Sequence, residues 1–318
     1  MVGLGLGVLL LAGDALVKGA VNLSLRLGVP ASIVGLTIVA FGTSAPELLV
    51  SVQAVLFGAP ALALGNVVGS NIANILLVLG VPALIAAVPV ARGVFRRDFV
   101  IMIAATLLFI GLAWLGPFGW PHALVLLAGL GAMLFDAFRR AQNHRNGTAA
   151  ALRDGTATLA PVDPQMSWLR IGVYTLLGLI GLPLGAELLV DGSVRIATAL
   201  GVSEAFIGLT LVAVGTSLPE LATTVMAAIR REAGVALGNV LGSSVFNLLG
   251  IIGVAALVGP IPVPPQMLVL DLWVMLGASL LLLPFVWFGR PIRRGTGMVL
   301  TALYVGYIGV LVMIGGGT

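Results

Sequence analysis

The sequence predicts an all-α polytopic membrane protein, with about ten transmembrane helices arranged as two inverted five-helix repeats. Of the 318 residues, 59% are hydrophobic and only 9% are charged, whereas about a quarter of the residues are charged in a water-soluble domain. The apolar runs are continuous, which excludes a large soluble domain and argues against a membrane barrel of alternating strands. In addition, the second half of the chain repeats motifs of the first half.

Ten apolar runs bounded by charge, Pro or Gly are long enough to cross a bilayer. A polar segment divides them into two groups of five, so we expect a first five-helix repeat at 1–140, a flexible cytoplasmic linker at 141–167 and a second five-helix repeat at 168–318. The N-terminus lacks the basic region of a cleaved signal peptide, so the first run is expected to be a retained span. The expected spans are 3–27, 33–57, 60–88, 98–116, 120–140, 168–197, 205–229, 233–259, 269–288 and 297–316.

The positive charges predict an orientation. Fifteen of the 16 Lys and Arg residues lie in or beside alternate connections, and the opposite connections and termini contain only Arg195. The positive-inside rule therefore predicts a multi-pass protein of the plasma (inner) membrane, with the central loop in the cytoplasm and both termini outside. This distribution explains the basic composition without nucleic acid as a partner. The absence of Cys removes disulfides and thiolate chemistry.

The internal repeat has a constant offset of 173 residues. The segment GLTIVAFGTSAPEL at 35–48 returns as GLTLVAVGTSLPEL at 208–221, and ALGNVVGSNIAN at 63–74 returns as ALGNVLGSSVFN at 236–247. Because each half has an odd number of expected spans, the second copy must enter the membrane from the opposite side. Inverted repeats of this kind place a substrate site near the bilayer midplane. Close helix packing would explain the glycines, but it does not explain a Glu within an apolar span, twice.

The repeated Glu residues, at positions 47 and 220, fall near the middle of their expected spans. A carboxylate at that depth costs several kcal/mol and is functional by default. The Pro before each Glu removes a helical hydrogen bond, which interrupts the helix and frees carbonyl oxygens. Hydroxyls and amides at helical spacing add further oxygens. The side chains of this oxygen set are Glu47, Glu220, Thr43, Ser44, Thr216, Ser217, Ser70, Ser243, Asn74 and Asn247.

A site made only of oxygen ligands, with two carboxylates, suits a hard cation. Ca²⁺ takes about six to eight oxygens, and two Glu charges neutralise it; Na⁺ tolerates the same ligands. Zinc or copper would recruit His or Cys, and the two His residues, His122 and His144, fall in expected connections. An intramembrane hydrolase would need a base beside Ser44 or Ser217, and neither has a neighbouring His or Lys in the sequence. We therefore expect no catalytic residues.

The paired GTSxPE and GSxxxN segments resemble the two α-repeats of the cation/calcium antiporter superfamily, closest to those of prokaryotic sodium/calcium exchangers. The resemblance implies that Glu47 and Glu220 are central Ca²⁺ ligands shared with Na⁺. It implies that the Thr and Ser hydroxyls of the set and the carbonyls of Ala40 and Ala213 supply further oxygens. It also implies a core of spans 2, 3, 7 and 8, across which spans 1 and 6 slide as a tilted pair. Asn247 departs from members that have Asp at this position.

The function implied by the resemblance is secondary active antiport of Ca²⁺ against Na⁺, by alternating access, in a protein that works as a monomer without a cofactor. The alternative is a Ca²⁺/H⁺ antiporter of the same fold, in which the two Glu residues carry protons. The retained Thr-Ser pairs favour Na⁺. A cation channel, commonly built from rings of ligands in an oligomer, is disfavoured by two inverted halves in one chain.

Four further charged residues lie on the first span of each repeat. Asp14 aligns with Glu187, and Lys18 aligns with Asp191. We expect them to line an aqueous rim on these long spans. The alternatives are that they gate ion access or that a Lys18–Asp191 contact orders the sliding pair.

Overall fold

The computed structural model describes residues 1–153, 166–199 and 213–315, and the side chains of these ranges apart from 147–153, 213 and 314–315. Within these residues, eight helices are long and apolar enough to cross a membrane, and one pair of helices bent by 43° makes a ninth span. The fold class predicted from the sequence is confirmed. The elements of the first half are α1 (Val2–Leu27), α2 (Ala31–Val34), η1 (Gly35–Val39), α3 (Ala40–Thr43), α4 (Ala45–Leu56), α5 (Pro60–Leu76), α6 (Gly80–Ile85), α7 (Arg96–Trp114) and α8 (Trp120–Arg153).

The second half follows the same order of helices. The first part of its expected span at 205–229 lies outside the described residues up to position 212. The described elements are α9 (Trp168–Ala199), α11 (Ala213–Gly215), α12 (Leu218–Ile229), α13 (Ala233–Val245), η3 (Phe246–Ile251), α14 (Ile252–Val258), η4 (Met267–Asp271), α15 (Leu272–Leu280), α16 (Leu283–Phe288) and α17 (Arg294–Gly315).

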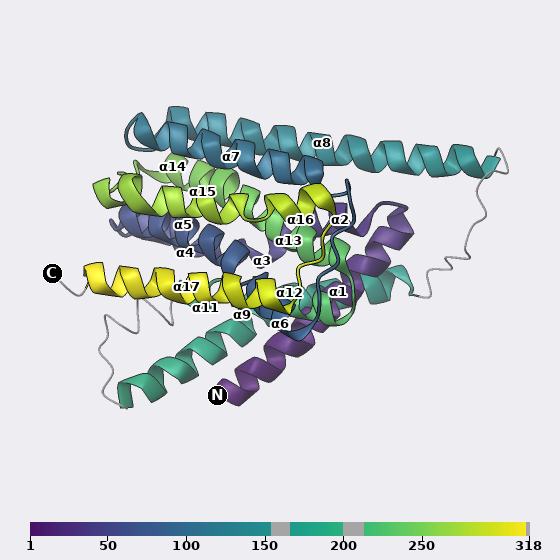
Figure 1. Cartoon of the computed structure of the whole chain (residues 1–318), viewed down its shortest axis with the longest axis horizontal. Coiled ribbons are helices and arrows are strands. Elements are labelled where there is room, and N and C mark those ends of the chain that lie inside the picture. Colours follow the sequence, from purple (N-terminus) through teal and green to yellow (C-terminus); the bar gives the residue numbers. More distant parts are fainter. Residues whose placement is uncertain (154–165, 200–212, 316–318) are drawn as a thin grey trace.

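Helix α8 is longer than the fifth expected span and projects beyond the neighbouring helices (Figure 1). It continues to Arg153, so the first part of the segment expected to be a flexible linker is helical, whereas 154–165 lies outside the described residues. Ala and Gln favour helix, and several of them follow Arg140 in the sequence. The expectation that His122 and His144 lie in connections is also wrong, because both residues lie on α8.

Helices α1 and α9 form an antiparallel pair that runs obliquely to the other helices (Figure 1). Glycines bring their backbones together: a Cβ added to Gly5 would lie 2.5 Å from the backbone nitrogen of Leu189, and one added to Gly19 would lie 2.9 Å from that of Thr175. Small residues of this kind permit close helix packing in membranes. The first spans of the two repeats therefore form one tightly packed unit.

The antiparallel register of this pair rules out the Lys18–Asp191 contact. Lys18 lies beside the α9 segment near Tyr174, whose ring centroid is 5.8 Å from its Nζ, whereas Asp191 lies at the opposite end of α9. Lys18 Nζ instead lies 2.8 Å from Asp14 Oδ2, one helical turn away. Asp14 also pairs with Arg230, at the end of α12. The alternative that Lys18 and Asp191 order the pair was wrong because aligned positions in inverted repeats do not face each other here.

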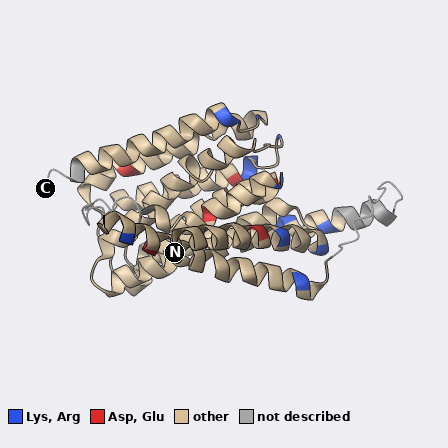
Figure 2. Ribbon diagram, turned by 90° about the horizontal axis from the view of Figure 1, so that it is seen from below, with Lys and Arg blue, Asp and Glu red and all other residues tan. Residues whose placement is uncertain are grey.

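The centre of the molecule is built from the broken helices of both repeats. Helix α13 packs on α2, η1, α3 and α12, while α4 packs on α5. A Cβ added to Gly238 of α13 would lie 2.6 Å from the carbonyl oxygen of Ser32, so the two backbones touch. Outside this centre, Figure 2 shows most of the Lys and Arg residues toward the end from which α8 projects. The segregation of charge expected from the sequence is therefore present in three dimensions.

Candidate ion-binding site

The helix that carries each glutamate is broken at the same place. Ser44 has φ −87° and ψ 6°, and its repeat counterpart Ser217 has φ −88° and ψ 4°, so both leave the helical conformation. A new helix then begins, with proline in its first turn. Because Pro46 has no N–H, it cannot pair with the carbonyl of Gly42, as its position in the sequence predicts. The break thus follows from the motif itself.

The new helices place both carboxylates at a helix N-terminus. Glu47 lies in the first turn of α4, and Glu220 lies in the first turn of α12. The positive end of the helix dipole stabilises a carboxylate there. Both side chains are inside the protein, with relative exposures of 0% and 1%. Two broken helices from opposite repeats therefore direct their carboxylates into one buried region.

One hydrogen bond joins the carboxylate of one repeat to the motif of the other. Ser44 Oγ donates to Glu220 Oε1 at 2.9 Å. Within the described residues, Glu220 Oε2 and both carboxylate oxygens of Glu47 are buried and have no hydrogen-bond partner. A buried carboxylate without a counter-charge costs several kcal/mol. The pair therefore requires compensation by a cation or by protons.

Other members of the oxygen set are buried and unpartnered in the same way. More than about 90% of buried polar groups in proteins have a partner, so a cluster of exceptions identifies a place where an ion or water completes the bonding. Within the residues that the structure describes, such atoms are found on Ser70, Asn74, Ser217, Ser243 and Asn247. All five residues belong to the oxygen set expected from the sequence. Several members of that set thus have buried polar atoms that no described residue satisfies.

Two asparagines that were not assigned to the site connect the repeats. Thr43 Oγ1 lies 3.2 Å from Asn239 Oδ1, and Thr216 Oγ1 lies 3.3 Å from Asn66 Oδ1. These two contacts are related by the repeat offset, and each crosses from one repeat to the other. The sequence contained the signal, because both asparagines belong to the repeated ALGN segment.

Each of these asparagines also donates from its amide nitrogen to a hydroxyl of its own repeat. Asn66 Nδ2 lies 3.0 Å from Ser51 Oγ, and Asn239 Nδ2 lies 3.3 Å from Thr224 Oγ1. An amide held in this orientation presents its oxygen to the threonine of the other repeat. Asn66 and Asn239 therefore hold the hydroxyls of Thr216 and Thr43, the threonines of the two GTSxPE motifs.

The backbone oxygens expected at the site are differently placed. The carbonyl of Ala40 accepts a hydrogen bond from the Ser44 N–H at 3.0 Å and lies 3.3 Å from Thr43 Oγ1. It is therefore still part of the helical ladder, and a hydroxyl donor lies near its second lone pair. Ala213 is the first residue of α11, and residues 200–212 before it lie outside the described residues. No cluster of three or more His, Cys, Asp or Glu side chains occurs in the described chain.

A cavity of about 320 Å³ borders this site. Asn66, Ser70 and Thr216 line it on the side of the carboxylates, and Gly65 and Gly69 of α5 line its wall. Its far side is formed by residues of η4 and α17. Ser70, whose hydroxyl has no partner among the described residues, therefore lines a space large enough to hold water.

The inverted helical repeats and the buried, oxygen-only site define a membrane transporter for cations. The chain belongs to the sodium/calcium exchanger protein family, whose model matches residues 1–137 and 171–313. It is therefore a cation/calcium antiporter of the prokaryotic type that the repeated motifs resemble.

Individual relatives agree with this assignment over nearly the whole chain. The sequence is 34% identical to the sodium/calcium exchanger MaX1 of Methanosarcina acetivorans, covering 98% of this chain and 97% of that protein. It is 33% identical to the inner membrane protein YrbG of Escherichia coli, covering 96% and 94%. A solved structure of the sodium-calcium exchanger NCX_Mj matches with a TM-score of 0.80 at 32% identity, covering 97% of this chain and 96% of that chain. The named exchangers are transporters, which confirms that this protein is not an enzyme.

Proposed function

We propose that the protein exchanges Ca²⁺ for Na⁺ across the membrane at the site between Glu47 and Glu220. The observation that carries this proposal is the pair of fully buried carboxylates from opposite repeats, with unpartnered oxygens around them. Their summed charge of minus two is cancelled by one Ca²⁺, which prefers such ligands. The proposed ligands are Glu47, Glu220, Thr43, Ser44, Thr216, Ser217, Ser70, Ser243, Asn74, Asn247 and the carbonyls of Ala40 and Ala213.

Alternating access is supported by a difference between the repeats at equivalent glycines. Gly238 and Gly242 of α13 are in contact with the backbone of α2 and η1. Their counterparts on α5, Gly65 and Gly69, instead line the cavity beside the site. One side of the site is thus closed by backbone contact, and a cavity borders it on the other side; the segment equivalent to that contact, 205–209, lies outside the described residues. In alternating access, the closed side and the side with the cavity would be exchanged, which would expose the site to each side in turn.

The orientation follows from the charges. We place the basic end, including the central segment after α8, in the cytoplasm of a cell whose inner membrane holds the protein, with both termini outside. The contact at Gly238 then closes the cytoplasmic half, and the cavity at Gly65 lies in the outer half. The packed pair α1 and α9 is the unit that we expect to slide across the core. Both repeats contribute to one site within a single chain, which supports function as a monomer with no cofactor.

We propose Na⁺ as the coupling ion, and a transport experiment distinguishes it from the proton. The same carboxylate pair can carry protons, so a Ca²⁺/H⁺ antiporter of this fold is the alternative. The hydroxyls of Thr43, Ser44, Thr216 and Ser217 favour Na⁺, because they are neutral oxygens that can coordinate Na⁺ and are not needed to carry protons.

The test is uptake of ⁴⁵Ca²⁺ into proteoliposomes that contain the purified protein. An outward Na⁺ gradient at equal pH is compared with an outward proton gradient at zero Na⁺. We expect rapid uptake in the first arrangement, and none in vesicles containing the Glu47→Gln variant. Uptake driven only by the proton gradient would show that Ca²⁺ is exchanged for protons and not for Na⁺. No uptake under either gradient would contradict antiport of Ca²⁺.

A further inference from the structure

A third pair of acidic residues follows the repeat offset, outside the site described above. Asp98 near the start of α7 corresponds to Asp271 at the junction of η4 and α15. Both carboxylates are inside the protein, with relative exposures of 2% and 8%. Buried acids within membrane spans are costly and require a partner. The two repeats meet this requirement in different ways.

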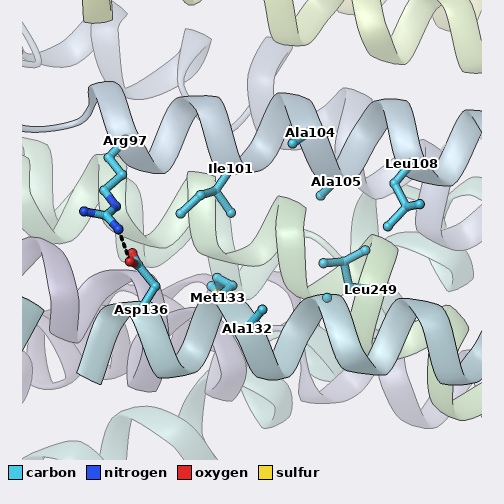
Figure 3. A pocket seen from close by; sticks show the side chains of 10 residues that line it. Arg97, Ile101, Ala104, Ala105, Leu108, Ala132, Met133, Asp136 and Leu249 are labelled. Carbon is cyan, nitrogen blue, oxygen red and sulfur yellow. Dashed lines mark hydrogen bonds and ion pairs between the residues drawn. The ribbon is translucent and has the colours of Figure 1, made fainter. Parts of the chain in front are cut away.

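In the first repeat, the carboxylate is neutralised by arginine. Arg140 Nη2 lies 2.7 Å from Asp98 Oδ1, and Arg140 Nε lies 3.0 Å from Asp136 Oδ2. Arg97 pairs with Asp136 at one end of an apolar cavity of about 360 Å³ between α7 and α8 (Figure 3). This cavity is lined by none of the proposed ligands. Asp98 therefore has a structural role, as half of an ion pair that joins two helices.

In the second repeat, the arginine is missing. Position 313, the counterpart of Arg140, is Met, and no Lys, Arg or His in the described ranges forms an ion pair with Asp271. Among the described residues, the hydrogen-bond donor to its carboxylate is the hydroxyl of Tyr307, 2.9 Å from Oδ1. A neutral phenol does not cancel the charge. The carboxylate of Asp271 thus lacks the compensation that Asp98 has.

The position of Asp271 suggests where its compensation comes from. Asp271, Tyr304 and Tyr307 line the cavity that also reaches Ser70 and Thr216 of the candidate site. Ser70 Oγ is buried and has no partner among the described residues. One space of about 320 Å³ is therefore lined both by Asp271, whose carboxylate is uncompensated, and by Ser70 of the candidate site. A cation in this space would interact with both.

We propose that Asp271, together with the phenol oxygens of Tyr304 and Tyr307, is an accessory binding residue that holds a hard cation on its way between the outer solution and the midplane site. This inference rests on the proposed function. One carboxylate and two neutral oxygens bind more weakly than the two carboxylates of the central site. The accessory position therefore concentrates ions in the cavity without trapping them.

The binding test uses Tb³⁺, a Ca²⁺ mimic whose emission is sensitised by nearby aromatic side chains such as Tyr304 and Tyr307. The full-length Glu47→Gln/Glu220→Gln variant removes both central carboxylates, so emission that remains reports other sites. We expect saturable emission that falls about tenfold when Asp271→Asn is added, because the anionic ligand is lost. The matched control adds Asp98→Asn instead, and we expect unchanged emission. Equal emission with and without Asp271→Asn would overturn the proposal.

The transport test separates entry of the ion from its translocation. In the otherwise intact protein, Asp271→Asn should raise the KM for Ca²⁺ supplied from the outer side several-fold and leave the maximal rate within twofold. Asp271→Glu should restore the KM. If Asp271→Asn does not fold, Tyr307→Phe in the Glu47→Gln/Glu220→Gln background should still weaken Tb³⁺ binding. An unchanged KM in Asp271→Asn would contradict the proposal. Failure of the wild type to transport Ca²⁺ would instead contradict the proposed function, while the Tb³⁺ result would remain informative.

Discussion

Ser44 donates a hydrogen bond to Glu220 across the boundary between the repeats, at 2.9 Å. The equivalent hydroxyl, that of Ser217, is buried without a partner in the described chain, as are both oxygens of Glu47. The two-fold relation between the repeats is therefore broken at the carboxylates themselves. Glu220 has a neutral donor from the protein, whereas no described side chain or backbone group donates a hydrogen bond to the carboxylate of Glu47.

We expect Glu47→Gln and Glu220→Gln each to abolish Ca²⁺ transport while the protein remains folded. Each residue supplies half of the charge that neutralises Ca²⁺, and a neutral amide cannot replace it in a buried site. In ion-free buffer, Glu47→Gln should raise the Tm, because it removes an uncompensated buried charge. The measurements are ⁴⁵Ca²⁺ uptake and thermal unfolding in detergent. Near-normal transport by either variant would remove that residue from the site.

Transport should be obligatory exchange rather than one-way flow. Reorienting the empty site would carry two uncompensated carboxylates through the protein interior, which is far more costly than moving them with a cation. Loaded vesicles should therefore retain ⁴⁵Ca²⁺ in an alkaline buffer without Na⁺ or Ca²⁺, and release it when Na⁺ is added. Rapid release into the first buffer is the outcome that contradicts this prediction.

Asn66 and Asn239, whose amide oxygens contact threonines of the other repeat, should affect ion binding although they are not proposed ligands. Asn66→Ala removes the partner of Thr216 and Ser51, so we expect a loss of about 1–3 kcal/mol in stability and a weaker apparent affinity for Na⁺. Asn71→Ala on the same helix is the control, because the buried Asn71 bonds only within its own helix, to the carbonyl of Val67. The control should lose stability without losing affinity. Equal affinities in the two variants would show that Asn66 has only a structural role.

Transport should not require K⁺. Asn74 and Asn247 occupy the positions where a third carboxylate would add the charge for one more monovalent ion, so the fixed charge is minus two and Ca²⁺ alone cancels it. Asn247→Asp should alter ion coupling or pH dependence more than folding. The measurement is Ca²⁺ flux with and without K⁺ at a constant Na⁺ gradient and clamped voltage. A strong K⁺ requirement in the wild type would show that the charge count is wrong.

Equivalent glycines should respond differently to the same substitution. Gly238→Ala places a Cβ against the carbonyl of Ser32. It should therefore disturb the closed half and lower the Tm of the purified protein. Gly65→Ala adds a methyl group to a residue that lines the cavity, so the protein should fold normally but close more slowly on that side. Thermal unfolding and the maximal exchange rate distinguish the two effects. Identical behaviour of the two variants would argue against alternating use of these contacts.

Much of the fold was predictable because lipid requires long apolar helices and the repeat fixed their number. The buried oxygen set was predictable for a related reason, since polar side chains inside an apolar span are conspicuous. The length of α8 was not, because helix-forming residues in a polar segment give no hydropathy signal. Asn66 and Asn239 were visible in the repeat, but their role depends on contacts between repeats. The predicted Lys18–Asp191 contact was wrong, because two positions that align in the repeats are equivalent in sequence but need not lie close together in space.

The crossed contacts Thr43–Asn239 and Thr216–Asn66 have a consequence for how the protein is made. The first repeat leaves the ribosome before the second repeat exists, so Thr43 and Asn66 are inserted without their partners. The polar surface of the first five helices has to stay in contact with water, or with the insertion machinery, until the second five arrive. We therefore expect the two halves to complete their assembly together in the membrane.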